Sequence, residues 1–307
     1  MARFLIAALF GGVIVSIAAA PAMAADAGQK SAKTIAASPT VDGDASKTVD
    51  APDGAFGFAD DSGTTGVGRY QFTLDFLPSW SGGAMTGRDL AARAEINTGL
   101  LDTLQLGVAA SGLNTRNTPR GEEIETARSY AFSLPGKWQW RAREVNDFGM
   151  AFLFEPFIGR QQNNPAPGGL IYGIDAKIAV DANIDNRFYA TFNIGYAISA
   201  TSPPVGGTDS SGLFYLSLAG SYRVTDGLYV GAQVRQGWQF AKAQPNTLDG
   251  NALALGPTIA WQLNDNLTFS AVYLRQVVGN DRARPASAFE LTDFRQNDAR
   301  VRMTLSF

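Results

Sequence analysis

The sequence predicts an all-β protein, a transmembrane antiparallel up-and-down β-barrel of about twelve strands in the outer membrane of a Gram-negative bacterium. Three observations predict this class. Apolar and polar residues alternate with a period of two from residue 68 to the last residue, 307. Short Asp-centred turns alternate with longer loops along the chain, as in outer-membrane barrels. Beyond the N-terminus, no apolar run reaches the roughly 18 residues that a spanning helix needs.

Residues 1–24 have the composition of a secretory signal peptide. Arg3 precedes an apolar stretch over residues 4–20, and an A-x-A pattern of the kind that signal peptidase recognises ends at Ala24. We therefore expect export of the chain from the cytoplasm, with cleavage of the signal peptide between Ala24 and Ala25. A retained N-terminal anchor helix is the alternative, and the small-residue cleavage pattern disfavours it.

Residues 25–66 form a polar segment that is rich in Ala, Asp, Gly, Ser and Thr and has no sustained period. A segment of low hydrophobicity cannot bury enough apolar surface to fold by itself. We therefore expect a mostly disordered periplasmic extension here. A short helix or a partial plug inside the barrel is the alternative. Residues 67–307 then make up the barrel domain.

The first strand shows the alternation clearly. Leu74 and Phe76 alternate with Thr73 and Asp75, so one face suits lipid and the other suits water. Similar runs of about 9–13 residues recur, which is the length that a tilted strand needs to cross a bilayer core. Strands of soluble sandwiches are usually shorter, about 5–6 residues. The predicted strands are 67–80, 88–98, 103–114, 122–135, 147–160, 170–182, 187–200, 212–224, 228–241, 251–263, 267–279 and 294–307.

Tight turns centre on Asp102, Asp185, Asp226 and Asp265. Asp, Asn and Gly suit such turns because they hydrogen-bond their own backbone or tolerate a positive φ. An even number of strands places both ends of the barrel on the periplasmic side, as export by a signal peptide requires, and ten or fourteen strands remain open. Longer loops rich in Gly, Pro and Ser alternate with these turns, at 81–87, 116–121, 161–169, 201–212, 242–250 and 279–293.

The alternation is weakest over residues 122–149. Arg128 would face lipid there, and the run from Trp138 to Arg141 would fall in an overlong periplasmic turn. Either a β-bulge that shifts the facing or a misplaced strand boundary would explain this stretch.

The C-terminal residues resemble the terminal strand of outer-membrane barrels, whose final Phe is associated with recognition by the barrel-assembly machinery. Val301, Met303, Leu305 and Phe307 alternate with polar residues, and the chain ends on the aromatic residue. We therefore expect these four residues to form an assembly signal. The expected partners are the assembly machinery and outer-membrane lipid. An ordinary amphipathic edge strand is the alternative.

The composition excludes most catalytic chemistry. The chain has no Cys and no His, which removes thiolate nucleophiles, disulfides, Ser-His-Asp triads and ordinary zinc sites. No GxSxG nucleophile elbow is present. The net charge of −3 gives no sign of a nucleic-acid surface. We therefore expect no enzyme activity, no catalytic or metal-binding residue, no cofactor and no nucleic-acid partner.

Charged residues on the polar faces of the predicted strands are the candidates for the wall of the lumen. Both signs occur in similar numbers, so the sequence does not predict a strongly anion-selective lumen. A sealed interior in which these charges pair with one another is the alternative. The lumen-facing candidates are Arg69, Asp75, Arg93, Glu95, Asp175, Lys177, Arg223, Arg235, Arg300 and Arg302.

Residues 101–108 and 123–130, followed by Pro135 and by residues 149–152, resemble the turn-and-strand style of one outer-membrane family. This is the family of the putative MetA pathway of phenol degradation, whose members are often called transporters. The resemblance covers roughly residues 67–307. It implies uptake or efflux of small organic compounds, and it carries over no ligand-binding residue because its motifs are turn chemistry.

We therefore expect a passive channel or transporter for small organic molecules, including hydrophobic or aromatic ones. The sequence does not indicate which solute passes. The alternative is a sealed structural barrel, or a surface-interaction barrel of the adhesin type whose long loops, 201–212 and 279–293, bind a partner.

Overall fold

The computed structural model describes residues 55–307 except 83–84, 120–124, 144–145, 147, 165–167, 186, 205, 283–287 and 292. No helix among these residues is both long and apolar enough to cross a membrane. The named elements are all strands: β1 (Tyr70–Ser81), β2 (Met85–Leu101), β3 (Leu104–Pro119), β4 (Glu125–Ser133), β5 (Gly136–Arg141), β6 (Phe148–Asn164), β7 (Gly169–Asn183), β8 (Phe188–Ser202), β9 (Asp209–Thr225), β10 (Leu228–Phe240), β11 (Leu248–Asn264), β12 (Leu267–Asp281) and β13 (Asn297–Ser306).

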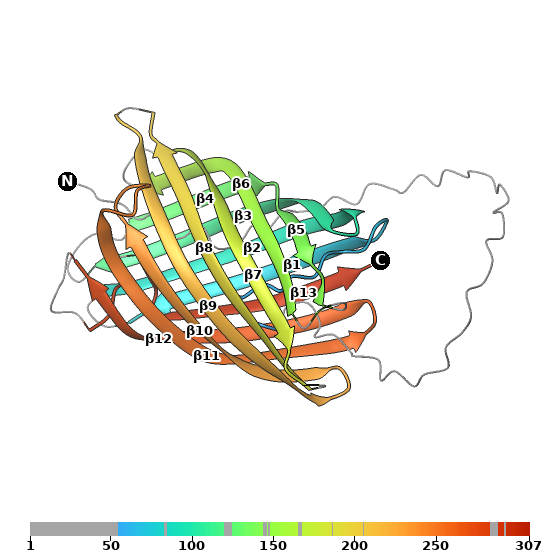
Figure 1. Cartoon of the computed structure of the whole chain (residues 1–307). Coiled ribbons are helices and arrows are strands. Elements are labelled where there is room, and N and C mark those ends of the chain that lie inside the picture. Colours follow the sequence, from blue (N-terminus) through green and yellow to red (C-terminus); the bar gives the residue numbers. More distant parts are fainter. Residues whose placement is uncertain are drawn as a thin grey trace, which may run out of the picture.

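The strands form one closed antiparallel barrel, as predicted (Figure 1). Apart from β4 and β5, which do not pair with each other, each strand pairs with its neighbours in the chain, and β13 pairs with β1 to complete the ring. β4 and β5 both pair with β3 and β6, so they are two halves of a single wall strand. The wall therefore has twelve strands. Closure leaves no strand edge to meet hydrocarbon, where unpaired backbone groups are costly.

The expected turn from Trp138 to Arg141 is wrong, because these residues belong to β5. Trp138 pairs with Leu104 of β3 and Phe152 of β6. The wall strand is interrupted just before β5 at Pro135, which has no N–H to donate to a ladder. A misplaced strand boundary therefore explains the weak alternation. Arg128 does face outward, but it lies near the beginning of β4, away from the middle of the wall.

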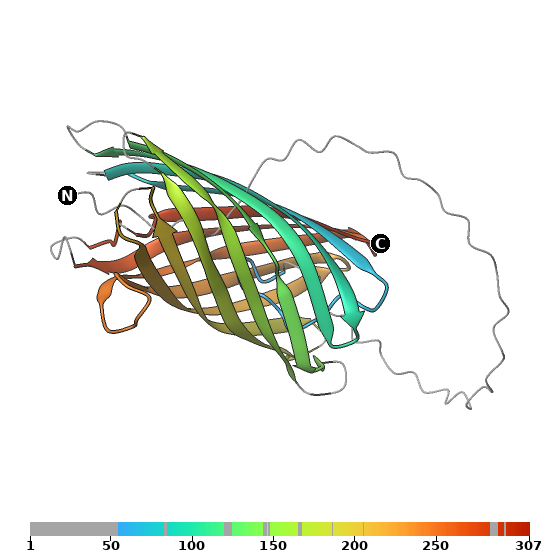
Figure 2. The ribbon, with the colours of Figure 1, turned by 90° about the horizontal axis from the view of Figure 1, so that it is seen from above.

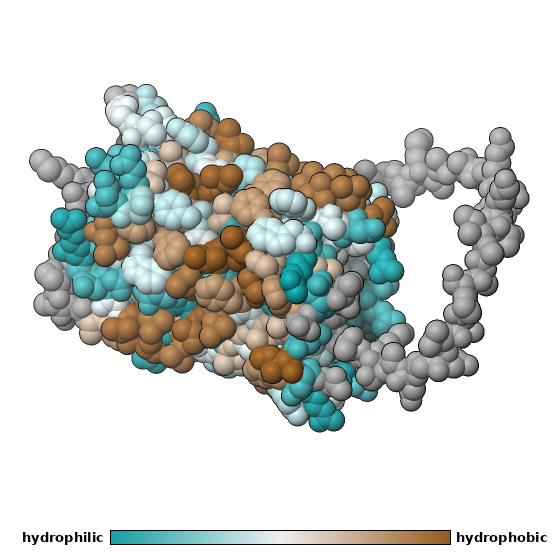
Figure 3. All heavy atoms as spheres, viewed as in Figure 1, coloured by the Kyte–Doolittle hydropathy of each residue, from teal (hydrophilic) through white to brown (hydrophobic). Residues whose placement is uncertain are grey.

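The two faces of the wall differ as the alternation predicts. Leu218 in β9 is 57% exposed on the outer face, whereas its neighbour Ser217 is 4% exposed on the inner face. Leu74 and Asp75 in β1 show the same contrast. Figure 3 shows apolar residues spread over the outer wall and hydrophilic residues gathered towards its ends. This is the surface that a membrane-spanning barrel presents to lipid.

The barrel has a turn end and a loop end. At the turn end, the backbones of Tyr70 and Phe307 exchange two hydrogen bonds of 2.7 and 2.9 Å, and their rings stack with centroids 5.9 Å apart. The strand connections at this end include residues 102–103, 184–187, 226–227 and 265–266. The loop end carries the longer connections, among them 203–208, 241–247 and 282–296.

Residues 55–66, which we name the lumen segment, depart from the expected periplasmic placement. The segment runs inside the ring of strands just before β1 (blue in Figure 2). Ala55, Phe56 and Ser62 are almost completely buried. The segment lies in the lumen because its apolar side chains and backbone N–H groups find partners on the inner wall. Residues 1–54, including the predicted signal peptide and its cleavage site, lie outside the described residues.

Candidate functional site in the barrel lumen

An apolar cluster anchors the lumen segment near the turn end. Phe56 is 1% exposed and packs in one cluster with Tyr189 and Tyr229, which lie at the beginnings of β8 and β10. The two tyrosine rings are 5.9 Å apart. Ala55 and Ala59 belong to the same cluster, so three apolar residues of the segment share one buried contact with the wall.

Backbone N–H groups of the lumen segment donate hydrogen bonds to buried side chains of the wall rather than to a strand. Such a bond contributes about 0.5–1.5 kcal/mol. Releasing the segment would break these bonds but would leave the backbone ladders of the barrel intact. The bonds run from Phe58 N to Gln233 Oε1 (2.8 Å), from Asp60 N to Asn193 Oδ1 (2.7 Å), from Ser62 N to Asp181 Oδ1 (2.9 Å) and from Thr65 N to Gln105 Oε1 (2.8 Å).

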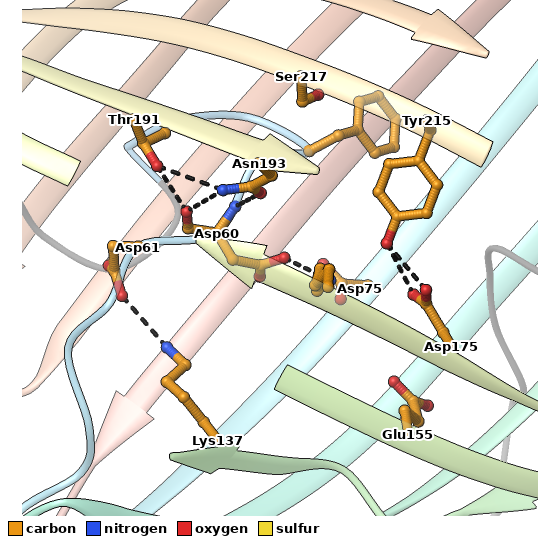
Figure 4. Close-up of polar contacts among 12 residues, drawn as sticks. Asp60, Asp61, Asp75, Lys137, Glu155, Asp175, Thr191, Asn193, Tyr215 and Ser217 are labelled. Carbon is orange, nitrogen blue, oxygen red and sulfur yellow. Dashed lines mark hydrogen bonds and ion pairs between the residues drawn. The ribbon is translucent and has the colours of Figure 1, made fainter. Parts of the chain in front are cut away.

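Asn193 and Thr191 of β8 hydrogen-bond to the backbone of Asp60 at both its N–H and its carbonyl group. Asn193 accepts the Asp60 N–H and also donates from Nδ2 to the Asp60 carbonyl oxygen at 2.8 Å. Thr191 Oγ1 donates to the same carbonyl at 2.7 Å. The next residue, Asp61, accepts from Lys137 Nζ at 3.2 Å. Figure 4 shows these contacts converging on the segment.

The Asp60 carboxylate is an anion held by cations of the wall. Its Oδ2 atom lies 2.5 Å from Lys177 Nζ. Burial raises the pKa of Asp60, but Lys177, Lys137 and Arg302 outweigh this effect and hold the pKa well below its ordinary value. The group is therefore charged at any pH near neutrality.

The Phe58 ring lies beside two arginines. The guanidinium carbon of Arg300 is 5.0 Å from the ring centroid and that of Arg235 is 5.7 Å from it. Both distances fall within the range of cation–π attraction. Arg300 Nε is 3.6 Å from Asp75, which also accepts two hydrogen bonds of 2.7 Å from Arg302. Arg300 Nη2 is buried and has no hydrogen-bond partner among the described residues.

A cavity of about 230 Å³ lies against residues 58–61 of the lumen segment. Its described lining holds six cationic side chains and six carboxylates. Two of the carboxylates belong to the segment, so the wall itself contributes six cations and four carboxylates. The cations are Arg93, Lys137, Lys177, Arg235, Arg300 and Arg302, and the carboxylates are Asp60, Asp61, Asp75, Glu95, Glu155 and Asp175.

Several of the wall charges are satisfied within the wall. Arg93 forms ion pairs with both Glu95 and Glu155. The Tyr215 hydroxyl hydrogen-bonds to the two oxygens of Asp175 at 2.9 and 3.0 Å (Figure 4). These contacts give the polar wall a fixed arrangement around the cavity.

Part of the last loop folds against the inner wall at the loop end. Arg295 donates to both oxygens of Asp89, at 2.5 and 2.8 Å, and to Asn117 at 2.9 Å. A second cavity of about 100 Å³ is lined by Phe294 of this loop and by Phe58 of the lumen segment. Phe58 lines both cavities, so it stands between them.

The family described as "Putative MetA-pathway of phenol degradation" matches residues 26–289 of the chain. The chain belongs to this family. No curated protein matches the sequence.

Three solved structures share the fold of this MetA-pathway family member at low sequence identity. An outer membrane channel from Pseudomonas putida F1 is 11% identical, with a TM-score of 0.53, and the match covers 80% of this chain and 98% of that one. The beta domain of the Bordetella autotransporter BrkA is 12% identical, with a TM-score of 0.52, covering 78% and 98%. The translocator domain of the autotransporter NalP from Neisseria meningitidis is 10% identical, with a TM-score of 0.51, covering 78% and 87%. The fold is thus that of outer-membrane barrels.

In this family member, the structure brings eight of the ten predicted lumen residues together around the larger cavity. Arg69 and Arg223 are the exceptions. Arg69 is exposed just before β1, and Arg223 lies on the inner side of β9 near the turn end, outside the cavity lining. The eight are Asp75, Arg93, Glu95, Asp175, Lys177, Arg235, Arg300 and Arg302.

Sequence reasoning missed four charged residues of the cavity. Glu155 lies at an alternating position of β6 that could have identified it, whereas Lys137 was hidden in the stretch mistaken for a turn. Asp60 and Asp61 belong to the lumen segment, whose sequence has no period to indicate an inward position.

The four residues of the predicted assembly signal lie on or next to the strand that closes the barrel. Val301, Leu305 and Phe307 are exposed on the outer face, and Met303 is half-buried. Their role in assembly stays a prediction.

Proposed function

We propose that this protein is a passive outer-membrane channel for small organic molecules, including hydrophobic or aromatic ones, and that the lumen segment must move for a solute to pass. The observation that carries the proposal is the cavity of about 230 Å³ between the polar wall and the segment. Engineered cavities of about 150 Å³ hold benzene, so one small organic molecule would fit.

The contacts that hold the lumen segment could break without unfolding the barrel, which supports a segment that moves. Its backbone bonds go to side chains, its charges pair with lysines, and one apolar cluster anchors it. None of these contacts is part of a strand ladder. A solute with differential affinity for the segment-free lumen would shift the protein towards that state.

The protein reaches the outer membrane from the cytoplasm in three steps. The chain is exported by the N-terminal signal, cleaved between Ala24 and Ala25, and folded by the barrel-assembly machinery, which reads the strand that ends at Phe307. Outer-membrane lipid then surrounds the apolar wall. The protein acts without a cofactor, without catalysis and without nucleic acid.

Conductance across planar bilayers tests the channel. We expect the full chain to remain closed with brief openings, and a variant that lacks residues 55–66 to conduct continuously and to pass small solutes into liposomes. Heat-modifiable electrophoretic mobility would establish that both barrels are folded. A folded deletion variant that neither conducts nor passes solutes would identify a sealed structural or surface-interaction barrel instead.

A further inference from the structure

The lumen segment presents an aromatic ring and a carboxylate two residues apart, and the wall meets each with cations. Arg300 and Arg235 lie 5.0 and 5.7 Å from the centre of the Phe58 ring. Lys177 lies 2.5 Å from the Asp60 carboxylate. All three cations line the cavity that the segment borders. The Phe58 ring and the Asp60 carboxylate therefore contact these cations in the way that the ring and the acidic group of one aromatic carboxylate would.

Removal of the segment would leave the wall with a surplus of positive charge. The cavity lining would retain six cations against four carboxylates. Lys177 would lose the carboxylate that it pairs with, and Arg300 Nη2 already lacks a hydrogen-bond partner while the segment is in place. A cation in a partly desolvated site is costly unless an anion accompanies it. The segment-free wall therefore favours an anion.

The positions of the arginines add a preference for an aromatic group. A flat ring at the place of Phe58 contacts two guanidinium groups at once. A small aliphatic anion would satisfy Lys177 but would leave these two ring contacts unmade. A neutral aromatic molecule would make the ring contacts but would not replace the carboxylate that Asp60 supplies to Lys177. A ring that carries an acidic group satisfies both.

We propose that the solute of this lumen is a small aromatic carboxylate, and that it binds where Phe58 and Asp60 lie and so displaces the lumen segment. This inference rests on the proposed channel function and specifies its substrate class. Because segment and solute use the same wall groups, each excludes the other. The segment then holds the lumen closed until the solute competes for Lys177, Arg235 and Arg300.

Calorimetric titration of the full chain, folded in detergent, tests the inference with benzoate, benzyl alcohol and acetate as probes. We expect benzoate to bind at least tenfold more tightly than either of the other two. The double variant Phe58→Ala/Asp60→Asn, which weakens the segment's own hold, should bind benzoate about tenfold more tightly than the unmodified chain. A segment with a purely structural role would not produce this gain.

Two further variants separate specific binding from partition into detergent. Lys177→Gln, introduced into the double variant, should lower the benzoate affinity at least tenfold and leave that for benzyl alcohol unchanged. Lys242→Gln, in an exposed loop, should change neither. Equal affinities for benzoate and benzyl alcohol would overturn the inference, and so would a benzoate affinity that is the same in the double variant as in the unmodified chain. The conductance of the segment-deleted barrel is a separate measurement, so a failure of benzoate binding would leave the proposed channel function intact.

Discussion

The substitution Phe56→Ala should release the lumen segment while the barrel stays folded. Phe56 is 1% exposed within the cluster that includes Tyr189 and Tyr229. Truncating a buried Phe to Ala typically costs about 3–5 kcal/mol. Here the cost falls on the docked state of the segment, because the wall strands keep their ladders. At about 1.4 kcal/mol for each tenfold change, a cost of about 3 kcal/mol shifts the docked-to-released ratio by more than a hundredfold.

Single-channel recording in planar bilayers measures this shift as the ratio of closed to open dwell time. Phe132→Ala is the matched control, because Phe132 is 64% exposed on the outer face and does not touch the segment. Hydrogen exchange at the Phe58, Asp60 and Ser62 amides should rise in parallel with the open time, since these amides donate to the wall. Equal dwell times in Phe56→Ala and the unmodified chain, with faster exchange, would refute the claim that the segment closes the lumen.

Three further predictions concern charge, lipid contact and assembly. The docked segment holds the pKa of Asp60 below its ordinary value of 3.8, so the charged carboxylate stabilises docking at pH values above 3.8, and this stabilisation is lost as the pH falls below 3.8. Conductance should therefore rise in acid. The variant Asp60→Asn should be open at pH 7 and should show no such rise. Leu218→Arg, on the lipid face, should lower the free energy of unfolding in vesicles by about 2–4 kcal/mol, and Ser111→Arg, beside the cavity, should cost less; equal losses would contradict the assigned faces. Deletion of Phe307 should lower the yield of folded barrel in the outer membrane without changing export to the periplasm, and an unchanged yield would remove the assembly signal.

The sequence was sufficient to predict the wall because the facing of each strand is a local property. Asp75, Lys177 and Arg302 could be placed inward from their immediate neighbours alone, and the structure places them around the cavity. The same rule failed at Leu134 and Pro135, which interrupt a wall strand, and the run that follows them resembles a turn. Only the pairing of Trp138 with two neighbouring strands shows that the wall continues.

The lumen segment could not be predicted in this way because its contacts are remote in sequence. Phe58 and Gln233 are 175 residues apart, and Asp60 and Asn193 are 133 residues apart. The segment has the polar composition of a disordered extension, and its order comes from amide side chains on the wall. A buried Gln or Asn at an inward position, such as Gln233 or Asn193, is the trace that this docking leaves in the sequence.

A reversible crosslink between the lumen segment and the wall would show whether the segment closes the barrel and moves during transport. A Cβ at position 149 in β6 would lie 3.1 Å from the Cβ of Ser62, a few tenths of an ångström short of the roughly 3.5–4.5 Å found in disulfides, and 2.9 Å from Asp181 Oδ1, so the Asp181 side chain would have to shift slightly. The chain has no cysteine, so a Ser62→Cys/Gly149→Cys pair would form without competition. In planar bilayers the oxidised double variant should not conduct, and adding a reductant should open it. The conductance of Ser62→Cys alone should not change when the reductant is added. Equal conductance in the oxidised and reduced states would show that the segment does not close the lumen.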